Sequence, residues 1–251
     1  MSKLLNAAIL EGVVLLFVIF IVVMLYIRYF NRKKTASLLL AVAFTFWLIA
    51  IICLFTFRVL AYLVEIALIT ELFDYSDFGI NLGYIFSAFS NVFILFFVAY
   101  IFSQSPLFRR TGFYLPFSYA SLNGVTIGLL VNATIREWPN PEYALGTTLY
   151  HLILTFMAFS TLIIFAVRPL RRATYKWEKA GFVFILCSGI FGILIYLSFA
   201  VDVVIGGGYT TFFFLAYAFS ILMIIFAYMG YVMPNFVRNW FKEKSIEEPA
   251  K

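Results

Sequence analysis

Several ionisable side chains lie within or just beyond long apolar stretches of this sequence, and these are the residues whose chemistry stands out. Glu11 lies about two turns and His151 about one turn into such a stretch, Asp202 lies near the end of another, and Arg58 directly follows one. A charge at membrane depth costs several kcal/mol unless it reaches water, a partner or a proton. Because Glu11 has no lysine or arginine near it in its own apolar stretch, Arg58 is its expected partner.

The spacing of Arg58, Tyr62 and Glu65 places them on one face of a helix, provided that this helix continues beyond the apolar run. In an upright helix Arg58 lies at the outer membrane boundary and Glu65 projects about 10 Å above it. The pattern also suits a snorkelling arginine on a solvated face, and a lone histidine more often has an ordinary structural role. The predicted outward-facing ligand site consists of Glu11, Arg58, Tyr62, Glu65, Asn91, His151 and Asp202.

The sequence contains no motif typical of an enzyme or of a cofactor site. His151 is the only histidine, which excludes a three-histidine zinc site and a haem held by two histidines. No lysine for a Schiff base lies inside an apolar run, and no glycine-rich phosphate loop, nucleophile elbow or metal-spaced cysteine pair occurs. We therefore expect no catalytic residues, no bound metal and no cofactor.

The elements that must position these residues are apolar helices. The chain has 251 residues, of which 64% are hydrophobic, and a mean hydropathy of +1.01, whereas soluble domains are only about half apolar. Runs of about 20 apolar residues each match a bilayer core of roughly 30 Å. We predict an all-α, polytopic membrane domain over residues 1–233, followed by a tail over residues 234–251. The seven predicted spans cover about 4–28, 36–57, 81–102, 113–135, 147–167, 180–204 and 211–233.

The distribution of basic residues predicts the orientation of these spans. Fifteen of the eighteen lysines and arginines fall in four segments: 28–34, 109–110, 168–179 and the tail after Pro234. The positive-inside rule places these segments in the cytoplasm, with the amino terminus outside. The net charge of +6 therefore indicates topology and no nucleic-acid partner. We expect a multi-pass protein of the cell membrane.

The basic segments also supply candidate contacts at the cytoplasmic face. They suit a separate cytoplasmic or membrane effector protein, and they equally suit the anionic headgroups of the lipid bilayer. The residues predicted to bind a partner or lipid are Arg109, Arg110, Arg171, Arg172, Phe236 and Arg238.

Two of the spans end with a similar sequence, which indicates an internal repeat. Each carries an Ala-Tyr pair, a proline six residues after the tyrosine, and then a phenylalanine and an arginine. The parity of the spans fits a three-plus-one-plus-three arrangement with the fourth span as linker. Proline, an aromatic residue and arginine are also a common way for a membrane helix to end. The matching positions are Ala99, Tyr100, Pro106, Phe108 and Arg110, and Ala227, Tyr228, Pro234, Phe236 and Arg238.

The overall pattern resembles a known class of membrane module. This pattern consists of seven apolar helices, an alanine-rich second span that contains Ala43 to Trp47, and an aromatic third span that contains an asparagine and is followed by Arg109 and Arg110. In these features the chain is similar to the seven-helix input modules of prokaryotic sensor proteins, notably sensor histidine kinases. The resemblance implies a sensory function. Those modules are normally fused to an effector, whereas only a short tail follows Pro234 here, so we expect signalling through a separate partner.

Three functions are therefore compatible with the sequence. The first is a stand-alone sensor or a subunit of a membrane complex. The second is a small-molecule or ion transporter or channel, with Glu11, Arg58 and Asp202 lining a path. Carriers commonly use helices broken by proline or glycine, whereas Pro116 is the only proline within a predicted span here, which makes a carrier less favoured. The third is an accessory subunit that binds no ligand.

Overall fold

The computed structural model describes residues 2–139, 145–206 and 209–241. Within these ranges every regular element is helical and no strand is present, which confirms the all-α prediction. In chain order the helices are α1 (Lys3–Arg32), α2 (Thr35–Glu65), α3 (Tyr75–Ile101), α4 (Pro106–Thr111), α5 (Tyr114–Arg136), α6 (Leu145–Arg172), α7 (Lys176–Gly206), α8 (Thr211–Ala227), the π-helical turn η1 (Tyr228–Val232) and α9 (Asn235–Trp240).

In the described part of the chain, seven helices are long and apolar enough to cross a membrane, as the sequence predicts. They are α1, α2, α3, α5, α6, α7 and α8 extended by η1. The large side chains on their outer faces are apolar, with Leu16, Phe117 and Ile164 each more than 60% exposed. A soluble protein rarely exposes such broad apolar surfaces, so lipid is the expected environment of these faces. The chain is a multi-pass membrane protein.

Several helices extend beyond the apolar runs because polar caps, rather than hydropathy, determine where they begin. α3 begins at Tyr75, several residues before its apolar run, since the Asp74 carboxylate accepts a hydrogen bond from the backbone N–H of Asp77 at 2.9 Å. Ser2 caps α1 in the same way through the N–H of Leu4 at 3.1 Å. Apolar runs therefore mark the membrane-facing part of each helix and not its full length.

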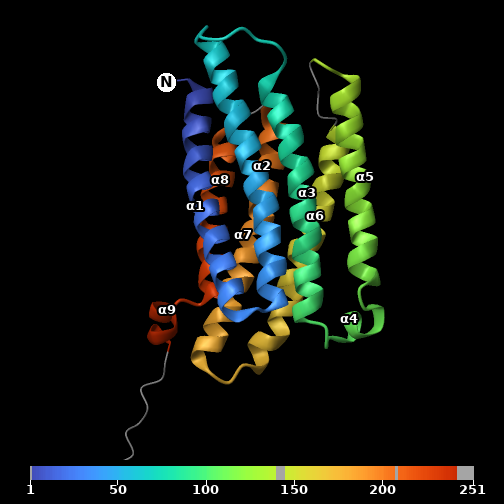
Figure 1. Cartoon of the computed structure of the whole chain (residues 1–251), viewed down its shortest axis with the longest axis vertical. Coiled ribbons are helices and arrows are strands. Elements are labelled where there is room, and N and C mark those ends of the chain that lie inside the picture. The colour runs from blue at the N-terminus through green and yellow to red at the C-terminus, as the bar shows by residue number, and fades with distance from the viewer. Residues whose placement is uncertain (1, 140–144, 207–208, 242–251) are drawn as a thin grey trace, which may run out of the picture.

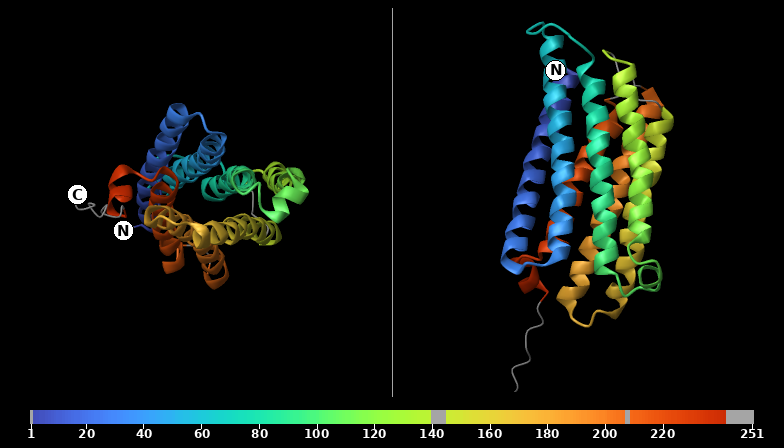
Figure 2. Two further views of the ribbon diagram at one scale, coloured as in Figure 1. Left: turned by 90° about the horizontal axis from the view of Figure 1, so that it is seen from below. Right: turned by 45° about the vertical axis from the view of Figure 1, so that its right-hand side comes forward.

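The long helices form one bundle, and its two ends differ (Figure 1). We call the end at which α1 begins the upper end, and the end that carries α4 and α9 the lower end. The view from below shows α5 at the edge of the bundle, beside α3 and α6 (Figure 2). The other long helices form a ring in which each contacts the next: α1, α2, α3, α6, α7, α8 and again α1.

This ring fits the predicted repeat. If α1, α2 and α3 are matched to α6, α7 and α8 in that order, each contact of the ring corresponds to another contact of the ring, and α5 remains as the linker. The short helices α4 and α9 follow α3 and α8 at the same end of the bundle (Figure 1). A ring of consecutive helices gives the same pairing without any duplication, so the repeat stays a prediction.

Candidate functional site

A buried ion pair lies between the first two helices in the upper half of the bundle. Nε of Arg58 on α2 is 3.4 Å from Oε1 of Glu11 on α1, and the side chains are 3% and 0% exposed. The hydroxyl of Tyr217 on α8 donates to the same carboxylate oxygen at 2.8 Å. The pairing expected from the sequence is therefore present, with a third partner from α8 that the sequence did not indicate.

The guanidinium of Arg58 extends this contact to further elements. Its Nη1 donates to the hydroxyls of Ser76 at the start of α3 and of Tyr209 just before α8. Its Cζ also lies 4.9 Å from the ring centroid of Tyr209 and 5.9 Å from that of Phe213. One guanidinium therefore joins α2 to α1, α3 and the beginning of α8. We call Glu11, Arg58, Ser76, Tyr209 and Tyr217 the upper cluster.

The upper cluster retains one unused acceptor. Among the described residues, Oε2 of Glu11 has no hydrogen-bond partner, although it is buried. Tyr209, which lies between two spans, is largely shielded from water, and this burial raises the pKa of its phenol above the ordinary value. Tyr209 is therefore neutral at physiological pH, and the charges of the cluster reside on Glu11 and Arg58.

Asp202 on α7 organises the chain beside the upper cluster without joining it. Its Oδ1 accepts hydrogen bonds from the backbone N–H of Thr210 at 2.8 Å and from the Thr210 hydroxyl at 2.5 Å. The Thr210 hydroxyl in turn caps α8 by accepting from the N–H of Phe212 at 3.2 Å. Asp202 thus fixes the segment from which Tyr209 reaches Arg58, and it acts on the cluster through the backbone.

Two other predicted residues, Tyr62 and Glu65, lie above the cluster. α2 does continue to Glu65, as the sequence predicts. Glu65 is exposed and accepts a hydrogen bond from the hydroxyl of Ser2, while Tyr62 is half-buried. These two residues therefore belong to the protruding top of α2 and not to the set around Arg58.

His151 and Asn91 belong to a second group of polar residues on α3, α6 and α7. Nε2 of His151 is 3.3 Å from the Ser87 hydroxyl, which is 2.5 Å from the hydroxyl of Tyr196. The amide of Asn91 donates to the Thr155 hydroxyl at 2.7 Å. We call Ser87, Asn91, His151, Thr155 and Tyr196 the middle network. The predicted single site is thus divided into the upper cluster and the middle network.

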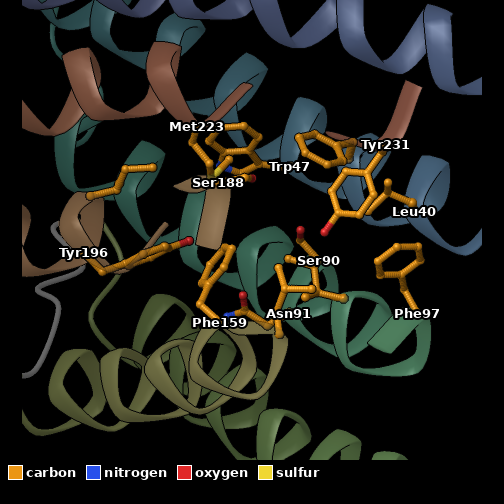
Figure 3. Close-up of a pocket in the computed structure, with 14 residues that line it drawn as sticks. Leu40, Trp47, Ser90, Asn91, Phe97, Phe159, Ser188, Tyr196, Met223 and Tyr231 are labelled. Atoms are coloured by element: carbon orange, nitrogen blue, oxygen red, sulfur yellow. The ribbon is translucent and has the colours of Figure 1, made fainter. Parts of the chain in front are cut away.

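Small cavities lie beside the middle network. One, of about 30 Å³, has Trp47, Ser90, Asn91, Tyr196 and Tyr231 in its wall; the hydroxyls of Ser90 and Tyr231 point toward one another there (Figure 3). Another, of about 60 Å³, lies between Ser87 and Tyr196 of the middle network and Tyr217 of the upper cluster. A cavity needs about 10–15 Å³ to hold one water, so these spaces suit a few waters rather than an organic ligand.

A much larger cavity, of about 860 Å³, opens at the lower end. Its wall includes Arg28 from α1, Arg168 and Arg172 from α6, and Trp177 and Glu178 from α7. We call it the lower cavity. Arg172 was a predicted contact residue, whereas Arg28 and Arg168 were not singled out. The only sequence signal for Arg28 and Arg168 was their place in the basic segments. A cavity between helices depends on tertiary packing, which local sequence does not reveal.

The remaining predicted contact residues surround the lower end. Arg109 and Arg110 are exposed on α4, and Arg171 is exposed near the end of α6. On α9, Phe236 is 51% exposed. Arg238 lies across the ring of Trp177, with its Cζ at 4.9 Å from the centroid, so it fastens α9 to the start of α7.

No family model, curated protein or solved structure matches this chain. The bundle, the upper cluster and the lower cavity are therefore the features that indicate a function.

Proposed function

We propose that this protein is a stand-alone membrane sensor of the cell membrane, which relays a change at its upper end to a partner at its lower end. The observation that carries the proposal is the buried contact between Glu11 and Arg58, shared with residues from α3 and α8. The basic residues at the lower end support an orientation with that end in the cytoplasm. The resemblance to seven-helix sensory input modules agrees with this function.

A buried ion pair is suited to a switch because the paired charges and the separated charges differ strongly in free energy. The attraction between the charges compensates for their desolvation only while the geometry holds, and loss of either charge leaves the other buried without a partner. A proton or a ligand that reaches Glu11 would therefore release Arg58. Since Arg58 also contacts Ser76 and Tyr209, α1, α2, α3 and α8 would respond together.

The relay to the lower end runs along α1 and α8. Near the upper end Tyr217 of α8 binds Glu11 of α1, and near the lower end Arg28 of α1 donates to the carbonyl of Val232 at the end of η1. Arg28 lines the lower cavity, and so do Gly230 and Met233, within and just after η1. A shift of α8 against α1 would thus change the shape of the lower cavity, and π-helical turns such as η1 are frequent at functional sites.

Distances between spin labels test this relay. Cys53 and Cys187 are replaced by serine, and labels are attached to cysteines at Leu107 on α4 and Lys179 on α7, each next in sequence to a residue that lines the lower cavity. We expect Glu11→Gln to change the distance distribution in lipid nanodiscs. Glu65→Gln, which alters an exposed carboxylate at the same end, should leave it unchanged. Identical distributions in the two variants would refute the relay.

A transporter is the second candidate, and the contrast between the two ends favours it. The upper cluster is sealed from water while the lower cavity is wide, as expected of a carrier closed on one side and open on the other. Proton uptake into proteoliposomes, followed with a pH-sensitive dye, distinguishes the candidates. Uptake that disappears in Glu11→Gln would identify a carrier, whereas a sensor shows the change in label distance without uptake.

A further inference from the structure

The lower cavity has the size and position of a ligand site. Its volume of about 860 Å³ far exceeds that of the cavities inside the bundle. It lies between the ends of α3 and α6 and the beginning of α7, with α1 and η1 completing the wall. At the lower end of a membrane bundle, such a cavity is accessible to molecules from the adjacent aqueous phase and from the lipid headgroup layer.

The charge of the cavity wall is positive. Arg28, Arg168 and Arg172 line it, against the single carboxylate of Glu178. Arg28 is occupied by its hydrogen bond to the Val232 carbonyl. Arg168 and Arg172 are one helical turn apart on α6, both are exposed, and neither forms an ion pair within 4.0 Å with a described acidic residue. Two guanidinium groups therefore line one region without forming an ion pair with a described residue.

Neutral hydrogen-bond donors also line the lower cavity. Gln104 and Ser105, just before α4, both line the cavity. The Ser105 hydroxyl accepts from the N–H of Phe108 at 3.4 Å, so its own hydrogen remains free to donate. Two guanidinium forks, an amide and a hydroxyl offer more donors than a carboxylate can accept. They suit a phosphate group, whose terminal oxygens, two in a diester and three in a monoester, are strong acceptors that arginine recognises as it does a carboxylate.

The deeper wall of the cavity is apolar. Phe165 on α6 and Phe182 and Ile185 on α7 line it above the arginines. This order, with charged groups toward the lower rim and apolar groups toward the bundle, is that of a phospholipid at a membrane surface. Basic pockets between membrane helices commonly hold such headgroups.

We propose that the lower cavity binds a phosphate-bearing anion through Arg168 and Arg172. Binding at this site does not require the proposed sensing function, because Arg168 and Arg172 are not residues of the upper cluster, although the proposed relay ends at the same cavity. Two sources provide the chemistry. One is an anionic phospholipid whose acyl chain covers the apolar wall, and the other is a soluble phosphate ester that enters from the aqueous phase.

Native mass spectrometry of the full chain tests the proposal. The protein is delipidated in detergent and titrated with dioleoyl phosphatidylglycerol, with dioleoyl phosphatidylcholine and, separately, with glycerol 3-phosphate. The test variant is Arg168→Ala/Arg172→Ala. The matched control is Arg32→Ala/Lys34→Ala, which removes two exposed cations near the turn between α1 and α2, at the same end of the bundle and outside the cavity wall.

We expect one tightly held phosphate compound per chain in the wild type and in the control. Binding should weaken about tenfold or more in the test variant, because charge-assisted hydrogen bonds are lost. Retention of phosphatidylglycerol identifies a lipid as the source, and retention of glycerol 3-phosphate identifies a soluble ester. The proposal is overturned if the two double variants bind equally well. It is also overturned if phosphatidylcholine binds as tightly as phosphatidylglycerol and the arginine substitutions have no effect. Thermal unfolding of each variant verifies that it is folded.

Discussion

Arg58 lies 3.4 Å from Glu11 although 47 residues separate them in the chain, and both side chains are buried in the bundle. Among the contacts of the described residues, Arg58 is the only side chain that joins α1, α2, α3 and the segment before α8. Their mutual dependence follows from burial. Neither charge reaches water, so each requires the other.

The first prediction concerns the stability of this pair. Glu11→Gln or Arg58→Met alone should destabilise the fold by about 3–5 kcal/mol, because either one leaves an unpaired buried charge. The double variant should lose less than the sum of the two single losses, since it leaves no charge unpaired. Unfolding in mixed detergent micelles measures the effect. Glu65→Gln, at an exposed carboxylate, should stay within about 0.5 kcal/mol of the wild type. Additive losses would mean that the two charges are not coupled.

The Glu11–Arg58 contact also shows how much of the site the sequence could predict. Glu11 is a carboxylate in an apolar run that needs a partner, and Arg58 is the basic residue nearest the same membrane boundary. Tyr217 could not be identified, because α8 is apolar on all sides and its pattern does not reveal which face points inward. Asp202 was placed correctly at the upper end, but its role as a cap depends on a loop conformation that hydropathy does not encode.

The fold could be predicted from the sequence more fully than the site, for a physical reason. Each span is long enough and apolar enough to be recognised from its own residues, as α1 and α2 illustrate. The lower cavity is lined by arginines from α1 and α6 and by residues of α3 and α7, so it depends on tertiary packing. Local sequence indicates that Arg168 and Arg172 are near a membrane surface, but not that they face a common space.

The second prediction concerns alkaline pH. Burial gives the phenol of Tyr209 a pKa above its ordinary value of about 10. The folded protein therefore retains this proton more tightly than the unfolded chain does. The contribution of Tyr209 to stability is complete below about pH 10 and decreases as the pH rises toward the higher pKa of the folded state. Unfolding midpoints between about pH 8 and about pH 11 should decline less steeply in Tyr209→Phe.

The control for this prediction is Tyr114→Phe, because Tyr114 is 83% exposed on α5. Because this variant removes no buried hydroxyl, its unfolding midpoints are the reference for those of Tyr209→Phe. Equal slopes for Tyr209→Phe and the wild type would show that Tyr209 is not protected by the fold.

The third prediction concerns the close approach of η1 to α7. A methyl group at Gly230 would lie 3.0 Å from the backbone nitrogen of Ile185 and 3.1 Å from the carbonyl oxygen of Gly181. Backbone atoms cannot move aside as a side chain can, so Gly230→Ala should destabilise the protein by about 1–3 kcal/mol. Small residues at such contacts are typical of membrane helix packing. Thermal unfolding in one detergent measures the change.

Gly124→Ala is the matched control, since a methyl group there meets nothing within 4 Å. Gly124 is exposed on α5, and alanine is favoured over glycine within a helix, so this variant should be neutral or more stable by up to about 1 kcal/mol. A loss at Gly124 as large as that at Gly230 would contradict the packing of η1 against α7.

The fourth prediction separates the middle network from the upper cluster by magnitude. The hydrogen bond between Asn91 and Thr155, at 2.7 Å, joins two neutral groups on α3 and α6. Such bonds between membrane helices contribute only about 0.6 kcal/mol on average, because the groups find other partners when the pair is broken. A double-mutant cycle with Asn91→Ala and Thr155→Val should therefore give a coupling energy near this value and below about 2 kcal/mol.

A second cycle, which pairs Asn123→Ala with Thr155→Val, provides the baseline, because the Asn123 amide donates to the Tyr119 carbonyl of its own helix at 3.0 Å. That cycle should show a coupling energy close to zero. A coupling between Asn91 and Thr155 as large as the effect of losing Glu11 would contradict the assignment of the switch to the upper cluster. A small coupling agrees with it, since only the loss of a charge leaves behind a group that the apolar bundle cannot accommodate.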